Sequence, residues 1–403
     1  MIEELLQAKK LIQQAVDARD TEMREIALKI HANPELAFNE YKAVHWLTEP
    51  LKKADFQVEM GIAGLETAFR ASWSGGAGGP IIAFLAEYDA LPEIGHACGH
   101  NLIGTAAVGA ALALKDAFPD FPGTIEVFGT PAEEDGGGKI IMCEKGVFDH
   151  VDAAMLCHPR QSNMVMRGGL ACVDTTLKFY GKQAHASSEP EKGISALEAL
   201  INSYVAINSL RQFFKQDVRI HGIISRGGDA ANVVPDYCEA KFMFRAPTVK
   251  ELHVVREKVY AAARHCTEAV GARFEMSEGL IYAERNNNKY LSGLFKDNLT
   301  LMGLEVTNPP ERGGIGSSDI GNVGQVTATI HPYIRIGDVT PHTPEFRDAA
   351  GSEGGMTGLN QAAKALAMTA YDLCYDPDSL RQVRDEFEKW KSSHEAIEAV
   401  TQF

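Results

Sequence analysis

Apolar residues recur along the first part of the chain with two different spacings. From residue 4 to about residue 56 they recur every three to four positions, with an interruption at Asn33-Pro34, which predicts two helices. Strand-like apolar runs then alternate with helix-like runs at 102–118 and 139–145. The strand-like runs cover residues 66–71, 81–86, 124–130 and 153–157. Such alternation is typical of an α/β domain with a mainly parallel sheet.

The pattern changes after about residue 172. The order becomes strand, helix, strand, strand, helix and strand, at residues 173–180, 194–214, 219–225, 237–244, 249–269 and near 273. This order predicts a small α+β domain of the ferredoxin-like kind. After residue 289 the first pattern returns, with a helix, a strand at 327–336 and two helices from residue 349. We therefore expect an α/β domain built from residues 1–172 and 288–403, with the small domain, 173–287, inserted into it.

Composition narrows the class of protein. A length of 403 residues with 45% hydrophobic and 23% charged residues is ordinary for a globular protein of two domains. The net charge of −15 argues against nucleic-acid or anionic-membrane partners, so we expect a small-molecule partner. The start Met1-Ile2-Glu3-Glu4 lacks the basic residues of a signal peptide, and no apolar run approaches the roughly 20 residues of a membrane span, so we expect a cytoplasmic protein. The seven cysteines include no C-x-x-C pair, which predicts reduced thiols.

Four short segments carry residue types that divalent metals bind. They are HACGHN with Cys98 and His100, PAEED with Glu133 and Glu134, LCHP with His158, and HTPEF with His342. Thiolate, imidazole and carboxylate ligands suit zinc, cobalt or manganese. Asp89, the Glu133-Glu134 pair and His158 each follow a predicted strand, and the carboxyl ends of parallel strands meet at one edge of a sheet. We therefore expect these side chains to lie close together.

The adjacent carboxylates of Glu133 and Glu134 suggest two different roles. Neighbouring side chains point in different directions, so one can bind a metal while the other reaches the metal-bound water as a general base. Each motif alone also has an ordinary interpretation: a buried thiol at Cys98, a solvated acidic loop, a core-edge histidine at His158. His331 is an alternative to His342, although it lies within a predicted strand. The combination of motifs favours a two-metal hydrolytic site.

Several segments resemble the aminoacylase and carboxypeptidase G family of metallopeptidases. The similarity is greatest to its amidohydrolase branch, which contains auxin-conjugate hydrolases and p-aminobenzoyl-glutamate hydrolase. The segments run in order along the chain: IHANPEL (30–36), AEYDALPEIGHACGHN (86–101), PAEED (131–135), GKQAHAS (181–187), ANVVPD (231–236) and HTPEF (342–346). The resemblance implies a metallo-exopeptidase-type catalytic domain, an inserted lid and dimerisation domain, and a homodimer or higher homo-oligomer.

The resemblance also implies two divalent metal ions per subunit, zinc, manganese or cobalt. It makes Cys98 a bridging ligand and Glu133 the general base, with the remaining ligands at His100, Glu134, His158 and His342. Asp89 falls where relatives have an aspartate that supports the site, and we expect it to orient a metal-bound imidazole. Many relatives have a metal-binding histidine two residues before that aspartate. Here the position is Glu87, so we expect His100 to take this role.

In the inserted domain, the resemblance points to residues that act on the substrate. His185 is expected to come from the neighbouring subunit and to stabilise the oxyanion, and Asn232 is expected to help bind substrate. Arg245 is expected either to bind the substrate carboxylate or to be structural. The segment GGIGSSD, residues 313–319 of the first domain, resembles a substrate-side loop that acts through its backbone amides.

We therefore expect a metal-dependent hydrolase that cleaves the amide bond of an N-acyl- or aminoacyl-amino acid with a free carboxylate. Dipeptidases, aminoacylases and p-aminobenzoyl-glutamate hydrolase are of this type. One alternative is a catalytically silent relative that serves as a binding or assembly module, but Glu133 and all the expected ligands are present. Another is a cysteine hydrolase using Cys98, for which His100, two residues away in a tight turn, is poorly placed as the base.

Overall fold

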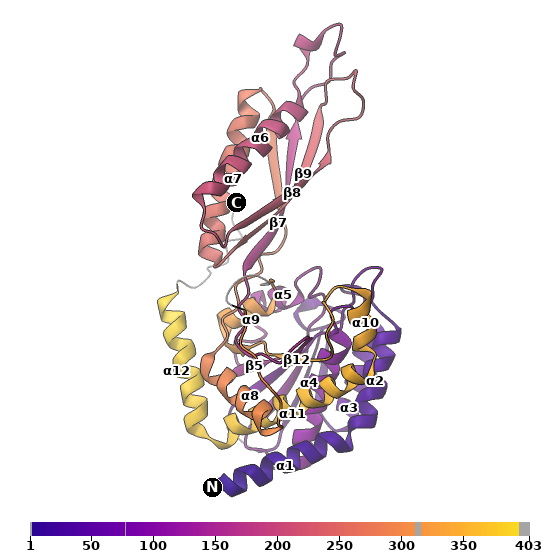
Figure 1. Cartoon of the computed structure of the whole chain (residues 1–403), viewed down its shortest axis with the longest axis vertical. Coiled ribbons are helices and arrows are strands. Elements are labelled where there is room, and N and C mark those ends of the chain that lie inside the picture. The colour runs from indigo at the N-terminus through magenta and orange to yellow at the C-terminus, as the bar shows by residue number, and fades with distance from the viewer. Residues whose placement is uncertain (1, 77, 311–315, 395–403) are drawn as a thin grey trace. The chain divides into compact units, whose positions relative to one another are not determined.

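The chain folds into two compact units, described here from a computed structural model (Figure 1). The structure describes residues 2–76, 78–310 and 316–394. Unit 1 consists of Met1–Gly168 and Arg285–Phe403, and unit 2 of Gly169–Glu284. None of the helices within the described residues is long and apolar enough to cross a lipid bilayer.

Unit 1 is built on a six-stranded sheet in the order β1-β2-β4-β3-β5-β11. The strands are β1 (Gln57–Met60), β2 (Phe69–Ser74), β3 (Ile81–Ala86), β4 (Thr124–Gly129), β5 (Ala153–Met155) and β11 (Ala328–Ile330). The four strands from β4 to β11 are parallel, and β2 and β1 extend the sheet in antiparallel pairing. A short parallel pair, β6 (His158–Arg160) with β12 (Tyr333–Arg335), lies beyond β5 and β11 in sequence. The expected mainly parallel α/β sheet is confirmed.

The helices of unit 1 depart from the predicted pattern before β1 and at two short helices, Ile320–Val326 and Pro344–Ala350, which were not predicted. The helices are α1 (Ile2–Ala18), α2 (Asp20–Ala32), α3 (Tyr41–Lys53), α4 (His100–Ala117), α5 (Gly138–Glu144), α8 (Lys289–Leu301), α9 (Ile320–Val326), α10 (Pro344–Ala350), α11 (Glu353–Tyr375) and α12 (Pro377–Ser393). Three helices precede β1 where two were predicted, because the chain breaks at Arg19, whose guanidinium binds Asp116 and Glu22. No proline or glycine marks that break. The predicted strand at 327–336 is likewise divided in two at Pro332, which has no N–H for a ladder.

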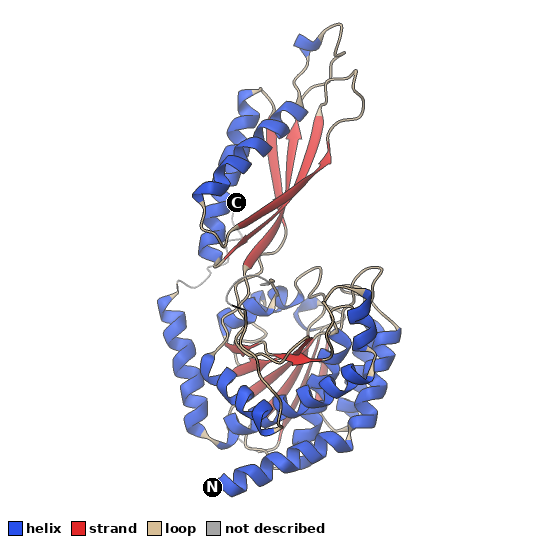
Figure 2. Ribbon diagram, viewed as in Figure 1, coloured by secondary structure: helices blue, strands red, loops and turns tan. Residues whose placement is uncertain are grey.

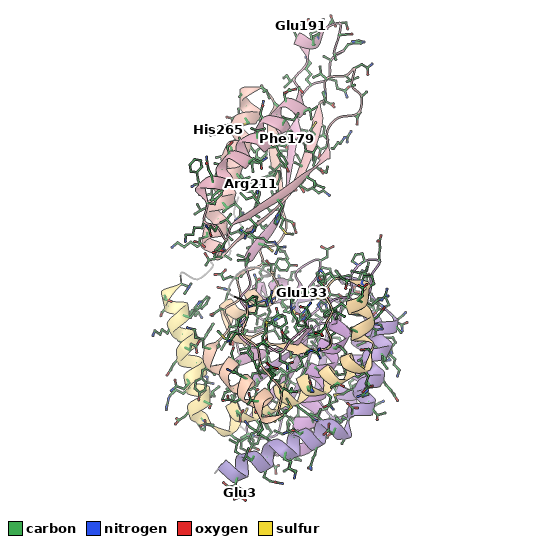
Figure 3. All side chains as sticks on the ribbon, viewed as in Figure 1. Glu3, Glu133, Phe179, Glu191, Arg211 and His265 are labelled. Carbon is green, nitrogen blue, oxygen red and sulfur yellow. The ribbon has the colours of Figure 1, made fainter. Side chains whose placement is uncertain are left out.

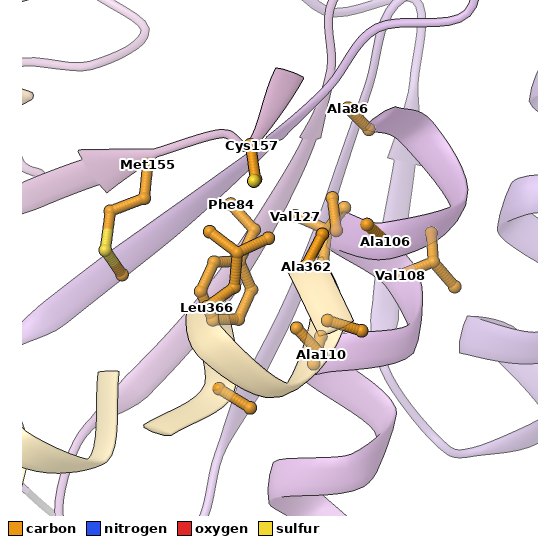
Figure 4. Packing of buried hydrophobic residues seen from close by; sticks show 14 of the residues in the cluster. Phe84, Ala86, Ala106, Val108, Ala110, Val127, Met155, Cys157, Ala362 and Leu366 are labelled. Carbon is orange, nitrogen blue, oxygen red and sulfur yellow. The ribbon is translucent and has the colours of Figure 1, made fainter. Parts of the chain in front are cut away.

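Helix α4 occupies the centre of unit 1. Its residues 100–114 are buried on every side. Alanines such as Ala106 and Ala110 let it approach both the sheet residue Phe84 and Leu366 of α11 (Figure 4). Because α4 begins at His100, tight packing of this helix also fixes the turn that carries Cys98 and His100.

Unit 2 has the predicted order of strands and helices. It contains β7 (Ala171–Tyr180), α6 (Ala196–Leu210), β8 (Arg219–Arg226), β9 (Tyr237–Ala246), α7 (Val249–Ala269) and β10 (Arg273–Glu278). The antiparallel sheet has the order β10-β7-β9-β8, which is the ferredoxin-like arrangement. Both helices lie on one face of the sheet (Figure 2). Residues of β9 alternate between buried and less buried, as expected for a sheet with one covered face.

Candidate active site

The strand ends of unit 1 deliver the predicted site residues to one place. Asp89 follows β3, the Glu133-Glu134 pair follows β4, and His158 follows β5 at the start of β6. The backbone N–H of Glu134 donates to Asp89 Oδ2 at 2.9 Å, so the loops after β3 and β4 are joined directly. Glu133 is labelled among the side chains of unit 1 in Figure 3.

All five expected metal ligands come together, in two groups of three that share Cys98. One group is Cys98, His100 and His158, and the other is Cys98, Glu134 and His342. Within each group, one ligand atom from every residue lies within 4.8 Å of the others. A thiolate common to two ligand groups has the placement expected of a bridge between two cations. His331, the alternative ligand, is buried beside His158 with ring centroids 5.2 Å apart, and it belongs to neither group.

Hydrogen bonds leave the lone pairs of the buried imidazoles facing the cluster. His100 Nδ1 lies 2.9 Å from Asp89 Oδ1, and His158 Nδ1 lies 2.8 Å from the carbonyl oxygen of Pro159. Both partners are acceptors, so Nδ1 carries the proton and Nε2 is available as a ligand. His158 Nε2 then lies 3.3 Å from Cys98 Sγ. Burial lowers the pKa of His158 well below its ordinary value, so this ring is neutral.

The polar atoms of the cluster fit a pair of cations. His100 Nε2 and Glu134 Oε1 are buried, and within the described part of the chain neither has a hydrogen-bond partner. His100 Nε2 lies 3.8 Å from Glu134 Oε1, and His342 Nε2 lies 3.6 Å from the same oxygen. Leaving such atoms without a partner costs on the order of 1–3 kcal/mol each, and a cation coordinated between them would remove that cost.

Glu133 faces the same space as these ligands. Its Oε2 lies 3.9 Å from His100 Nε2. Burial, together with the charges of Glu87 and Glu134, raises the pKa of Glu133 well above its ordinary value. A carboxylate of raised basicity beside a ligand cluster is suited to take a proton.

Beside the metal-ligand cluster, three carboxylates lie close together, and a buried lysine that was not anticipated from the sequence binds two of them. Glu87, Glu133 and Asp319 have ligand atoms within 4.8 Å of one another. Lys139 Nζ lies 2.8 Å from Glu87 Oε1 and donates to Asp319 Oδ1 at 2.5 Å. Lys139 is fully buried at the start of α5, just after the acidic PAEED loop. The sequence signal that could have indicated this buried lysine is its position as the one lysine in a short, mainly apolar helix. Asp319 is the last residue of the expected substrate-side loop, 313–319, and its side chain binds Lys139. Residues 313–315 of that loop lie outside the described residues.

Strained backbone and close packing hold the site loops. Gly99 has φ +81°, and a Cβ there would lie 2.4 Å from Pro159 Cγ, so a side chain would obstruct this turn. Ala132, just before Glu133, has φ +60°, and His342 has φ +63°. Glu40 accepts the Ala132 N–H at 2.9 Å, and Ala97 accepts the His342 N–H at 2.9 Å. Strained residues tied down next to reactive groups are typical of functional sites.

The structure brings His185 and Asn232 together in unit 2. His185 lies in the loop after β7 and Asn232 in the loop before β9, and Ala186 N–H donates to the Asn232 carbonyl at 3.1 Å. Both side chains are exposed. The Ser187 N–H donates to His185 Nδ1 at 3.3 Å, so the neutral ring carries its proton on Nε2 and can donate it outward. Glu191, labelled in Figure 3, follows a few residues later at the same loop end.

Arg245 lies at the other end of the same sheet. Tyr237 of β9 pairs with Tyr180, next to the loops of His185 and Asn232, whereas Arg245 pairs with Cys172. Eight residues of strand separate the two positions, about 26 Å at roughly 3.3 Å per residue. Within one chain, therefore, Arg245 does not join His185 and Asn232.

Comparisons with known proteins agree with this geometry. A family model described as a peptidase dimerisation domain matches residues 166–268. The Xaa-Arg dipeptidase of Mus musculus is 40% identical over 402 residues, covering 95% of this chain and 93% of that protein. A subunit of the p-aminobenzoyl-glutamate hydrolase of Escherichia coli is 35% identical over 271 residues, covering 62% of this chain and 56% of that protein. A solved Bacillus subtilis structure, a dinuclear metal-binding peptidase of the M20 family, is similar with a TM-score of 0.68 at 20% identity, covering 88% of this chain and 99% of that one.

The match to the mouse dipeptidase extends over nearly the whole of both chains, which is sufficient to assign the family. The structural match shows the same fold, with its mixed sheet and inserted dimerisation domain. The resemblance, the fold class and the reaction type expected from the sequence are thereby confirmed. The chain belongs to the M20 peptidase family and is a metal-dependent amide hydrolase.

Proposed function

We propose that this chain hydrolyses dipeptides or N-acyl-amino acids that end in a free carboxylate, at two divalent cations held by Cys98, His100, Glu134, His158 and His342. The observation that carries the proposal is the pair of ligand groups sharing Cys98, with Glu133 beside them. Zinc, manganese and cobalt all suit this ligand set. The relatives named Xaa-Arg dipeptidase favour an aminoacyl substrate with a basic C-terminal residue.

The cations would supply a water of lowered pKa and polarise the scissile carbonyl. Glu133 would accept a proton from the attacking water at its carboxylate and deliver it to the leaving nitrogen. Asp89 holds His100 in the ligand tautomer through Nδ1. His185, with its proton on Nε2, would donate to the oxygen on which negative charge develops.

We also propose a homodimer in the cytoplasm, formed through unit 2. The match of residues 166–268 to a dimerisation domain supports this assembly. A neighbouring subunit would then provide His185 and Asn232, and the exposure of both side chains is consistent with that role. Arg245 of unit 2 is retained as a substrate-binding or structural residue. The net charge of −15 supports a small-molecule substrate rather than nucleic acid or a membrane surface.

Cys98 is poorly suited to act as the nucleophile of a cysteine hydrolase. His158 Nε2 lies 3.3 Å from its sulfur, which is the spacing of a Cys–His pair. However, burial and then the charge of Glu134 raise the pKa of Cys98 well above its ordinary value, while the pKa of His158 is lowered. Both shifts favour a neutral thiol beside a neutral ring, and a reactive thiolate needs the opposite.

A hydrolysis screen with stripped protein tests the proposal. The panel contains aminoacyl-arginine dipeptides, N-acetyl-amino acids and p-aminobenzoyl-glutamate, each assayed without metal and with added zinc, manganese or cobalt. We expect turnover of at least one class only after metal is restored. Turnover that persists after exhaustive chelation would favour the cysteine hydrolase, and no turnover with any metal would favour a binding module.

A further inference from the structure

Unit 1 has a cavity of about 300 Å³ between helix α8 and two loop segments. One side is a face of α8, which is labelled in Figure 1, and the other sides are residues 165–166 and 306–309. None of the residues that line it is an expected metal ligand, the general base Glu133 or Asp89. Small-molecule sites in proteins have volumes of about 300–1,000 Å³. The cavity is therefore large enough for a small ligand, and it shares no lining residue with the candidate active site.

The face of α8 that lines the cavity is polar and partly open. Lys289, Ser292, Gly293 and Lys296 follow one another at intervals of one to three residues that place them along one side of the helix. A Cβ added at Gly293 would meet no atom within 4 Å, so the space above this residue is free. The apolar residues of the helix pack into the core of unit 1 instead, namely Leu291, Phe295 and Leu299.

Two ammonium groups at this cavity have no counter-charge. Among the described residues, neither Lys289 nor Lys296 has a carboxylate oxygen within 4.0 Å of Nζ. Ser292 is 1% exposed, and its hydroxyl oxygen is buried without a hydrogen-bond partner in this part of the chain. Ammonium groups and an unused hydroxyl proton are all donors, and they suit the oxygen atoms of an anion. The α8 side of the cavity is therefore complementary to a negatively charged group that the described chain does not supply.

The opposite side of the cavity is mainly apolar and is held in place by hydrogen bonds. The Thr307 N–H donates to the Asn163 carbonyl at 2.8 Å, and Asn163 Nδ2 donates to the Glu305 carbonyl at 2.8 Å. These bonds tie the two loop segments to each other, so the cavity is already formed before a ligand enters. Its apolar lining consists of Val165, Met166, Val306 and Pro309.

We propose that this cavity binds a small carboxylic acid with an apolar body, such as a medium-chain aliphatic acid. The carboxylate would pair with Lys289 or Lys296, and the hydrocarbon would cover the apolar lining and remove it from water. A small ion such as acetate would leave that lining wet, and an uncharged chain would leave the ammonium groups unpaired. Lysine acts as a flexible point charge, so the site would select for charge and length rather than for one exact shape. The acids released from N-acyl-amino acids belong to this class, but the site does not depend on the function proposed above.

Calorimetric titration of the metal-loaded protein with octanoate tests the proposal. Acetate, which lacks the apolar body, and 1-octanol, which lacks the charge, are titrated in parallel. We expect wild type to bind octanoate at least about 10-fold more tightly than either compound, the scale of one hydrogen bond to a charged group. The double variant Lys289→Gln/Lys296→Gln should weaken octanoate binding by about 10-fold or more and leave octanol binding unchanged. Lys10→Gln/Lys53→Gln, at two exposed lysines of α1 and α3, is the matched control and should bind as wild type does.

A second variant distinguishes this cavity from the metal centre, which could also bind a carboxylate. Gly293→Leu places a side chain in the free space above α8 and should abolish octanoate binding. A residue other than glycine favours the helix at this position, so the variant should fold, as checked by thermal unfolding. Octanoate binding that persists in Gly293→Leu would place the ligand at the metal centre and refute the proposal. Equal affinity for octanoate and octanol, no loss in the double lysine variant, or no saturable binding at millimolar octanoate would overturn it as well.

Discussion

The ligand cluster of unit 1 and the loop end of unit 2 are held in contrasting ways. His100 is completely buried, and its ring is oriented by Asp89 within the same unit. His185 is exposed, and among the residues that the structure describes its ring is hydrogen-bonded only by Ser187, two residues along the chain. The buried His100 imidazole, whose Nε2 has no hydrogen-bond partner among the described residues, is therefore already oriented as a ligand within its own unit. The exposed His185 must first be covered by another protein surface before it can donate a hydrogen bond in a site that excludes water. The predictions below test this contrast.

The largest effect is expected from Glu133→Gln. Removal of the general base should lower kcat by about 10²- to 10⁴-fold, while elemental analysis still finds bound metal, because the five ligands are unchanged. Glu134→Ala should instead lose metal. Asp135→Asn, at the exposed neighbouring residue, is the control and should keep wild-type activity. Near-normal turnover of Glu133→Gln would exclude Glu133 as the base.

Lys139→Met should cause the largest loss of stability. The substitution leaves Glu87 and Asp319 buried without their cation, and breaking a buried ion pair typically costs about 3–5 kcal/mol. Chemical denaturation measures the free energy of unfolding, with Lys145→Met, at an exposed residue just after α5, as the control. A change below about 1 kcal/mol would show that this lysine is not needed to neutralise the acidic group.

His185→Ala should lower kcat by about 10²-fold, the scale of losing an oxyanion donor, without loss of metal or stability. Lys182→Ala, exposed in the same loop, is the control. Mixing His185→Ala subunits with Glu133→Gln subunits should restore about half of the wild-type activity per heterodimer, since one of the two sites is then complete. Verified heterodimers without any recovery would place His185 in the site of its own chain.

The smallest effect is expected on the pH dependence of stability and concerns Glu40, whose carboxylate accepts a hydrogen bond from the backbone N–H of Ala132, next to Glu133. Burial raises the pKa of Glu40 from 4.5 to about 7. Because the folded-state pKa is the higher one, the stabilisation by Glu40 is complete below about pH 4.5 and is lost as the pH rises through 7. The stability of wild type relative to Glu40→Gln should therefore fall between pH 5 and pH 8 by at most about 3 kcal/mol. Glu59→Gln, on the exposed part of β1, should show no such trend.

The sequence predicted most of the fold because both sheets follow simple apolar patterns. The six elements of unit 2 match the predicted order, and the strand ends of unit 1 deliver the expected ligands. The break at Arg19 was missed, since no proline or glycine marks it.

The charged surroundings of the site were harder to predict. Lys139 meets Glu87 and Asp319 only in three dimensions, and Asp319 lies 180 residues further along the chain. Periodicity reports which face of an element is buried, but it does not report which charges meet across elements.

The ammonium group of Lys139 also bears on metal stoichiometry. Glu87, Glu133 and Asp319 are spaced closely enough to chelate an ion of their own, but a monovalent cation tethered to α5 already fills the position. Metal binding should therefore saturate at two equivalents per subunit. Excess zinc or manganese should not bind these three carboxylates and should not inhibit the enzyme through them.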